Sequence, residues 1–148
     1  MTTVYNEIII NASIEKIWKA LSDIDNLDKF DPTVKKVSLL TSTNFGVGSQ
    51  RKVDMKDGKN WFNETCTVYK PNESLLFELS ACSFPVQNLK HEYRFEPLGN
   101  QIKVKQKMVY QMKFGVIGKL FDFIMVKKQT NTGIKLFFQG LKEYAETK

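Results

Sequence analysis

Three side chains in the middle of the chain, Glu64, His91 and Tyr93, could exchange protons with a bound molecule. His91 is the only histidine, and an imidazole with a reference pKa near ~6.5 can serve as an acid, a base or a hydrogen-bond donor. A carboxylate and a phenol beside it would allow general acid/base catalysis. The alternative is that His91 is a satisfied interior residue, the commoner role of a lone histidine. No nucleophile elbow, metal-ligand pattern or phosphate-binding loop accompanies them, so any catalysis would depend on proton transfer alone.

A pair of opposite charges, Arg51 and Glu64, is the second chemical feature. If Asp57-Gly58 forms a two-residue type I′ turn, the strands on either side pair so that Arg51 lies opposite Glu64. Direct opposition would satisfy both charges, which favours a structural ion pair that closes one end of the sheet. The functional alternative is an anchor for the polar end of a ligand.

Charge pairing indicates the register of a later hairpin around Gly99-Asn100. A two-residue turn there places two glutamates opposite two lysines on a solvated face, Glu96 with Lys103 and Glu92 with Lys107. Because side chains alternate with a period of two, the same register turns the intervening residues inward. The predicted inner face carries Leu89, His91, Tyr93 and Phe95 opposite Tyr110, Met108, Gln106 and Val104, with Leu75, Phe77, Leu79 and Ala81 on the preceding strand.

The predicted inner face is more polar than a packed core tolerates, because each buried polar group needs a partner or water. A hydrated or ligand-filled pocket would explain this polarity. The inward polar residues are Arg51, Glu64, Cys66, His91, Tyr93 and Gln106.

The elements that position these side chains follow in the order strand, helices, strands, helix. Residues 4–11 predict a strand, and a helix with one buried face follows, capped by Asn11 or Ser13. A second short helix at residues 26–30 must stop before Pro32. Strands separated by turn residues occupy 34–112, and helical spacing returns for about 30 residues near the end. The apolar positions of the helix after the first strand are Ile14, Ile17, Trp18 and Leu21, and those of the long C-terminal helix are Leu120, Phe121, Ile124, Met125, Ile134, Phe137, Phe138, Leu141 and Tyr144.

Length and composition indicate one domain over residues 1–148. The chain is 42% hydrophobic with eleven phenylalanines, which is enough for one core. Two cysteines and one histidine predict neither a disulfide framework nor a zinc site, so we expect no metal and no cofactor.

The net charge of +6 is spread along the chain. We therefore expect no nucleic-acid partner, and we interpret Lys103, Lys105 and Lys107 as a solvated strand face.

Targeting features are also missing from the sequence. The longest apolar stretch, residues 116–126, is interrupted by Gly118, Lys119 and Asp122 and falls short of the roughly 20 residues that a membrane span needs. The first ten residues lack the basic start and apolar block of an export signal. We expect a cytoplasmic protein without a transmembrane segment, as a monomer or weak dimer.

The order of elements and several local motifs resemble the START-like superfamily, also called SRPBCC, which includes Bet v 1 and the polyketide cyclase/dehydrase family. The resemblance implies a helix-grip α+β fold: a curved, seven-stranded antiparallel sheet around a long C-terminal helix, with two short helices after strand 1. It also implies a cavity that opens near the N-terminal end of the long helix. Members bind lipids, sterols, plant hormones, polyketides or quinones. The motifs lie at residues 11–23, 27–34, 46–49 and 141–146.

The resemblance and the polar inner face together predict that a small hydrophobic or amphipathic ligand binds inside, with the protein as carrier or sensor. A cyclase or dehydratase using His91, Tyr93 and Glu64 is the alternative, and a protein-partner module is a third. Met108 and Met125 fit either adaptable cavity lining or core packing. The candidate ligand-binding residues are Phe30, Arg51, Phe62, Glu64, Cys66, Phe77, Leu79, His91, Tyr93, Gln106, Met108, Phe121, Ile124 and Met125.

Overall fold

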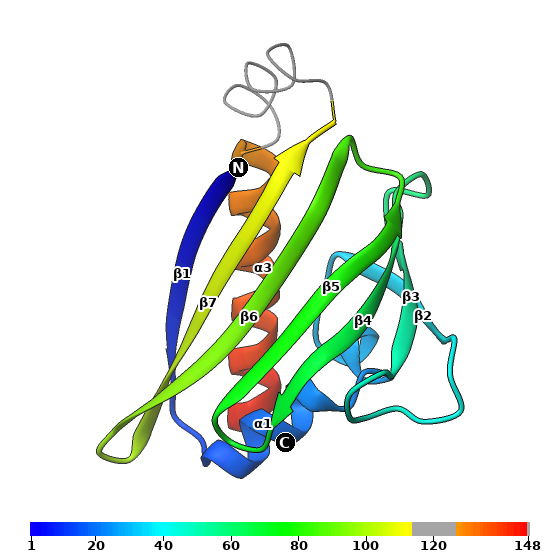
Figure 1. Ribbon diagram of the computed structural model, residues 1–148. Helices are drawn as coiled ribbons and strands as arrows, with labels where there is room; N and C mark the ends of the chain where they lie inside the picture. The colour runs from blue at the N-terminus through cyan, green and yellow to red at the C-terminus, as the bar shows by residue number, and fades with distance from the viewer. Residues whose placement is uncertain (114–126, 148) are drawn as a thin grey trace.

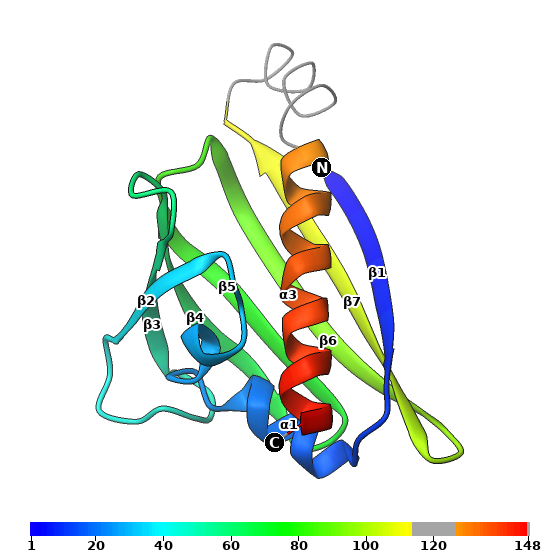
Figure 2. The same ribbon diagram turned by 180° about the vertical axis from the view of Figure 1, so that it is seen from behind.

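The computed structural model describes residues 1–113 and 127–147. Seven antiparallel strands form one sheet in the order β1-β7-β6-β5-β4-β3-β2, so only the contact between β1 and β7 joins strands far apart in the chain. The sheet curves around the C-terminal helix α3, which lies along its inner face (Figure 1, Figure 2). The elements are β1 (Thr2–Ile10), α1 (Ile14–Ser22), the 3₁₀ helix η1 (Leu27–Lys29), β2 (Val34–Leu39), β3 (Gln50–Met55), β4 (Trp61–Lys70), β5 (Ser74–Cys82), β6 (Val86–Leu98), β7 (Gln101–Met112) and α3 (Lys127–Thr147).

The predicted helix-grip plan is confirmed, including the helix and the 3₁₀ turn after the first strand. Ser13 caps α1, because its side chain accepts a hydrogen bond from the Lys16 backbone N–H at 3.3 Å. Asn11, the other predicted cap, instead donates its backbone N–H to Glu146 near the end of α3 at 2.9 Å. The part of the predicted 30-residue helix before Lys127 lies outside the described residues. Within the described ranges, no helix is long and apolar enough to cross a membrane.

The register of the β3–β4 hairpin is the predicted one, with Arg51 opposite Glu64. The predicted type I′ turn is wrong, because that turn needs a positive φ at both central residues and only Gly58, at φ +75°, has one. The carboxylate of Asp57 holds the turn instead by accepting hydrogen bonds from the backbone N–H groups of Lys59 and Asn60. Side-chain capping of the loop therefore replaces the expected backbone geometry.

The β6–β7 register is also confirmed, with Glu96 opposite Lys103 and Glu92 opposite Lys107. The ion pairs differ from the predicted ones. Glu96 reaches Lys105 at 2.8 Å, and the Glu92 carboxylate pairs with Arg94 at 3.0 Å. Ion pairs at the surface contribute little free energy, so the strand register does not determine which of several nearby charges a side chain contacts.

One inward prediction on β5 is wrong. Glu64 pairs with Leu79 but Asn63 pairs with Ala81, so Ser80 is an extra residue in a β-bulge. The bulge reverses the alternation beyond it, because two residues of β5 then oppose one of β4. Ala81 is consequently exposed. Cys82 faces inward, where it packs against a cluster formed by Val86, Tyr110 and Met112.

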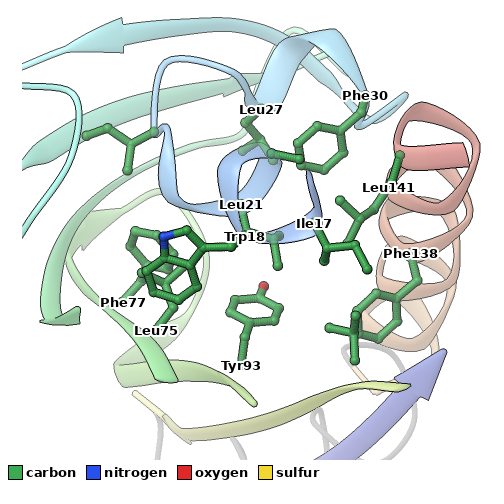
Figure 3. Packing of buried hydrophobic residues seen from close by; sticks show 14 of the residues in the cluster. Ile17, Trp18, Leu21, Leu27, Phe30, Leu75, Phe77, Tyr93, Phe138 and Leu141 are labelled. Atoms are coloured by element: carbon green, nitrogen blue, oxygen red, sulfur yellow. The ribbon is translucent and has the colours of Figure 1, made fainter. Parts of the chain in front are cut away.

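The main core joins α1, the sheet and α3 in one cluster (Figure 3). Aromatic rings meet edge-on where α1 reaches the sheet, with the Trp18 ring centroid 5.1 Å from that of Tyr69. This packing closes the α1 end of the space between the sheet and α3. The labelled members are Ile17, Trp18, Leu21, Leu27, Phe30, Leu75, Phe77, Tyr93, Phe138 and Leu141.

Candidate functional site: an interior cavity

A cavity of about 860 Å³ lies between the inner face of the sheet and α3. Its volume is within the range of about 300–1,000 Å³ that is usual for small-molecule sites. Ten of the candidate ligand-binding residues line it, and they come from η1 or its edge and from all strands from β3 to β7. These are Phe30, Arg51, Phe62, Glu64, Phe77, Leu79, His91, Tyr93, Gln106 and Met108.

The remaining candidates have other positions. Cys66 is buried but does not line the cavity, and its thiol lies 3.5 Å from the carbonyl oxygen of Val68. Burial raises the pKa of the Cys66 thiol to about 11, so this group stays protonated. Phe121, Ile124 and Met125 lie outside the described residues.

The cavity runs from α1 towards the beginning of α3. At the first end, Leu21 of α1 and Leu27 of η1 contribute to the wall. At the other end, the wall includes exposed and half-buried residues of two turns and of α3, which form its rim. Ser83 joins the two turns, because its hydroxyl accepts a hydrogen bond from the Trp61 backbone N–H at 2.9 Å. The rim residues are Asp57, Asn60, Phe84, Pro85, Lys128 and Thr132.

Glu64 is the centre of the buried polar network in the wall. One carboxylate oxygen lies 3.4 Å from Nη2 of Arg51, and the other lies 3.1 Å from Nε2 of His91. The Arg51 guanidinium also donates to the carbonyl oxygen of Ile24 at 3.0 Å and lies over the Phe77 ring, 4.9 Å from its centroid. Its contacts therefore link the sheet to the segment that follows α1.

The charges around Glu64 determine its protonation. Burial opposes ionisation, but the nearby Arg51 charge and the hydrogen-bonded His91 outweigh it and lower the pKa of Glu64 to about 2. An ionised carboxylate only accepts hydrogen bonds, so Nε2 of His91 must carry a hydrogen and donate a hydrogen bond to Glu64. Nδ1 of a neutral His91 ring is then an acceptor.

The hydrogen bonds beyond His91 follow from this tautomer. The Tyr93 hydroxyl, 3.0 Å from Nδ1, donates to His91. It accepts in turn from the side-chain amide of Gln106 at 3.0 Å, and Gln106 accepts from the Asn6 amide at 3.4 Å. Burial raises the pKa of Tyr93, so its hydroxyl stays protonated. All hydrogen bonds in the chain from Asn6 to Glu64 thus point in one direction across four strands.

Several wall residues were not among the sequence candidates. Phe84 and Pro85 were not predicted to line the cavity, because the direction of their loop depends on the bulge in β5. Leu89 was predicted on the inner face but not among the ligand candidates, and it lies in a second bulge of β6, where Asn88 has a φ of +56°. Ile134 and Phe137 carried a signal, their helical spacing, but that spacing fits a packed helix equally well. Tyr110 was likewise predicted on the inner face without being a ligand candidate. The other wall residues that were not candidates are Ala20, Leu21, Leu27, Thr33, Met55, Asp57, Asn60, Val86, Lys128, Thr132, Gly133 and Leu136.

A curved seven-stranded antiparallel sheet around a C-terminal helix is the helix-grip fold, which START and Bet v 1 structures share. The chain belongs to the family described as polyketide cyclase / dehydrase and lipid transport, whose model matches residues 1–146. No curated protein matches the sequence.

Solved structures with the same fold have low sequence identity to this chain. A START superfamily protein from Mycobacterium smegmatis is 19% identical, with a TM-score of 0.77 and 97% of each chain covered. The Bet v 1-type protein Ara h 8.0201 is 16% identical, with a TM-score of 0.80 and 99% of each chain covered. The Aha1 dimer from Colwellia psychrerythraea is 22% identical, with a TM-score of 0.72, covering 99% of this chain and 98% of that one. At these identities the similarity concerns the fold.

Proposed function

We propose that this protein binds a small hydrophobic or amphipathic molecule of lipid, polyketide or aromatic type in its interior cavity, as a carrier or sensor. The observation that carries the proposal is the cavity of about 860 Å³ under α3. Space of this size lined mainly by hydrophobic and aromatic side chains is typical of ligand sites. The aromatic part of the wall consists of Phe30, Phe62, Phe77, Phe84, Tyr93, Tyr110 and Phe137.

Filling the cavity from α3 is expected to abolish binding. Gly133 belongs to the wall, and a Cβ built on it meets no heavy atom within 4 Å. The Gly133→Phe variant should therefore place a ring in the cavity without a backbone clash, and lose at least about tenfold in affinity. The measurement is a fluorescence titration with the neutral probe N-phenyl-1-naphthylamine.

Lys135→Phe is the matched control, because Lys135 is exposed on the same helix and does not line the cavity. It should bind the probe as the unchanged protein does. Absence of saturable binding by the unchanged protein, or equal binding by the two variants, would contradict the proposal.

General acid/base catalysis in the same cavity is a second candidate, favoured by the hydrogen-bonded order Glu64, His91, Tyr93. A ligand carbonyl that accepts the Tyr93 hydrogen bond would free Nδ1 of His91 to remove a proton from the adjacent carbon. Glu64 would then stabilise the imidazolium. This chemistry is what a cyclase or dehydratase requires.

We expect this mechanism to accelerate hydrogen–deuterium exchange at the methyl group of 2-acetylnaphthalene. Acid/base groups typically contribute about 10²–10⁴-fold, so His91→Gln should reduce the rate by that order. NMR in deuterated buffer measures the exchange. A rate equal to that of buffer alone would remove the enzymatic candidate and leave the carrier intact.

We further propose that the protein acts in the cytoplasm as a monomer or weak dimer. The two cysteines support this location, because both are free thiols and stable thiols are usual in a reducing compartment.

A further inference from the structure

The charges inside the cavity wall balance each other. Besides His91, the described wall contains two basic and two acidic side chains. Asp57 and Lys128 have opposite charges and are exposed at the rim. The interior pair is Arg51, 5% exposed, and Glu64, 1% exposed. Since these two groups form an ion pair with each other, the buried part of the wall has no net charge when His91 is neutral.

The hydrogen-bonding groups in the wall are also engaged with each other. Glu64 accepts from Arg51 and His91, and Tyr93 both accepts and donates. The Nε of Arg51 has no partner, but less than 1 Å² of this atom is accessible, so a ligand cannot reach it without rearrangement. The single cation in the buried part of the described wall, Arg51, is therefore already paired with a carboxylate, and the other cation, Lys128, lies at the rim.

A ligand carboxylate would be an uncompensated third charge in this cavity. Desolvating an ion is costly unless an opposite charge pairs with it, and the only buried cation of the described wall is already paired with Glu64. A ketone, ester or hydroxyl has a far smaller desolvation penalty and can exchange hydrogen bonds with Tyr93 or His91. The charge balance thus discriminates between molecules of equal size and shape.

We propose that the ligand of this cavity is uncharged, apolar along its body with at most neutral oxygen groups, and that the cavity rejects fatty acids and other carboxylates. The inference rests on the proposed ligand-binding function and narrows it to a chemical class. The charge-neutral wall around the Arg51–Glu64 ion pair carries it.

Two probes with the same bicyclic body test the inference. 2-Acetylnaphthalene is neutral, and 2-naphthoate is ionised at about pH 8. Each is titrated against the protein loaded with N-phenyl-1-naphthylamine. We expect the ketone to displace this reporter with at least about tenfold higher affinity than the carboxylate. Equal or tighter binding of 2-naphthoate would overturn the inference and leave the proposed function standing, whereas failure of the reporter itself to bind would remove the proposed function.

The Glu64→Gln variant tests the cause of the selectivity. The substitution removes the negative charge but keeps the size of the side chain, so Arg51 becomes an unpaired cation in the wall. The preference for the ketone over the carboxylate should then fall by about tenfold or more. Glu96→Gln makes the same change on the outer face and should leave the preference as it was, and thermal unfolding verifies that both variants are folded. An unchanged preference in folded Glu64→Gln protein would refute the role of the ion pair.

Discussion

Replacing Gly140 by alanine is expected to lower the free energy of unfolding by about 3 kcal/mol, the upper part of the usual range for overpacking a tight contact. A Cβ at this position would lie 1.9 Å from the backbone oxygen of Phe30 and 3.1 Å from Cδ of Pro32. The obstacle is backbone, which cannot rotate away as a side chain can. Either α3 or the segment after η1 must move, and the core between them must open.

Gly133→Ala is the matched control for Gly140→Ala, because it makes the same change in the same helix where a Cβ meets open space. Alanine is favoured over glycine in a helix interior by about 1 kcal/mol, so this variant should be more stable than the unchanged protein. Urea unfolding of the three proteins measures both effects. Two stabilised variants would show that the close approach of α3 to Phe30 does not exist.

This contact explains how the cavity coexists with a stable core. Near its C-terminal end the helix is held tightly, because Gly140 closely approaches the segment after η1 and Leu141 is fully buried. The close contact at Gly140 thus anchors α3, while Gly133, two turns earlier, borders the cavity.

Much of the sheet could be predicted from the sequence because two kinds of signal agreed. Turn residues at Asp57-Gly58 and Gly99-Asn100 gave hairpin positions, and opposite charges across the strands gave the same registers. The inward direction of His91 and Tyr93 followed from period-two alternation alone. Turn residues, cross-strand charges and side-chain alternation were therefore enough to predict strand register and side-chain direction wherever a strand is regular.

The bulges and the helix contacts could not be predicted in this way. The bulge at Ser80 depends on how β5 fits β4, and no local residue type signals it. Gly140 has the sequence signature of a helix breaker, and only the tertiary contact with Phe30 reveals its function. The size of the cavity depends on these same long-range fits, which is why its wall was predicted in the middle of the strands and missed at Phe84-Pro85.

The buried ion pair should dominate the response of this protein to single substitutions in its wall. Glu64→Leu leaves Arg51 as an unpaired buried cation, and breaking such a pair costs about 3–5 kcal/mol. The double variant Arg51→Met with Glu64→Leu removes both charges and should regain most of that loss. A double variant as unstable as the single one would mean that packing, and not charge, makes the pair important.

The same pair predicts the acid sensitivity of the fold. The pKa of Glu64 is about 2 in the folded protein against an ordinary value of 4.5, so the folded state binds this proton less readily than the unfolded state. Its stabilisation is complete above about pH 4.5 and is lost as the pH falls towards 2. Burial raises the pKa of Asp31, which contributes with the opposite sign, and the double variant retains Asp31 but loses the Arg51 charge that lowers its pKa.

Urea titration of the unchanged protein and the double variant between about pH 6 and about pH 2.5, below the ordinary carboxylate pKa, measures what removal of the ion pair changes, including the effect of Arg51 on Asp31. The unchanged protein should lose more free energy of unfolding over this interval than the double variant does, because only it must protonate Glu64. Parallel curves would show that the carboxyl group is already protonated in the fold. The cavity wall would then carry the net positive charge of Arg51 and attract the carboxylates that a neutral wall excludes, so this measurement on stability also tests the selectivity proposed for the ligand.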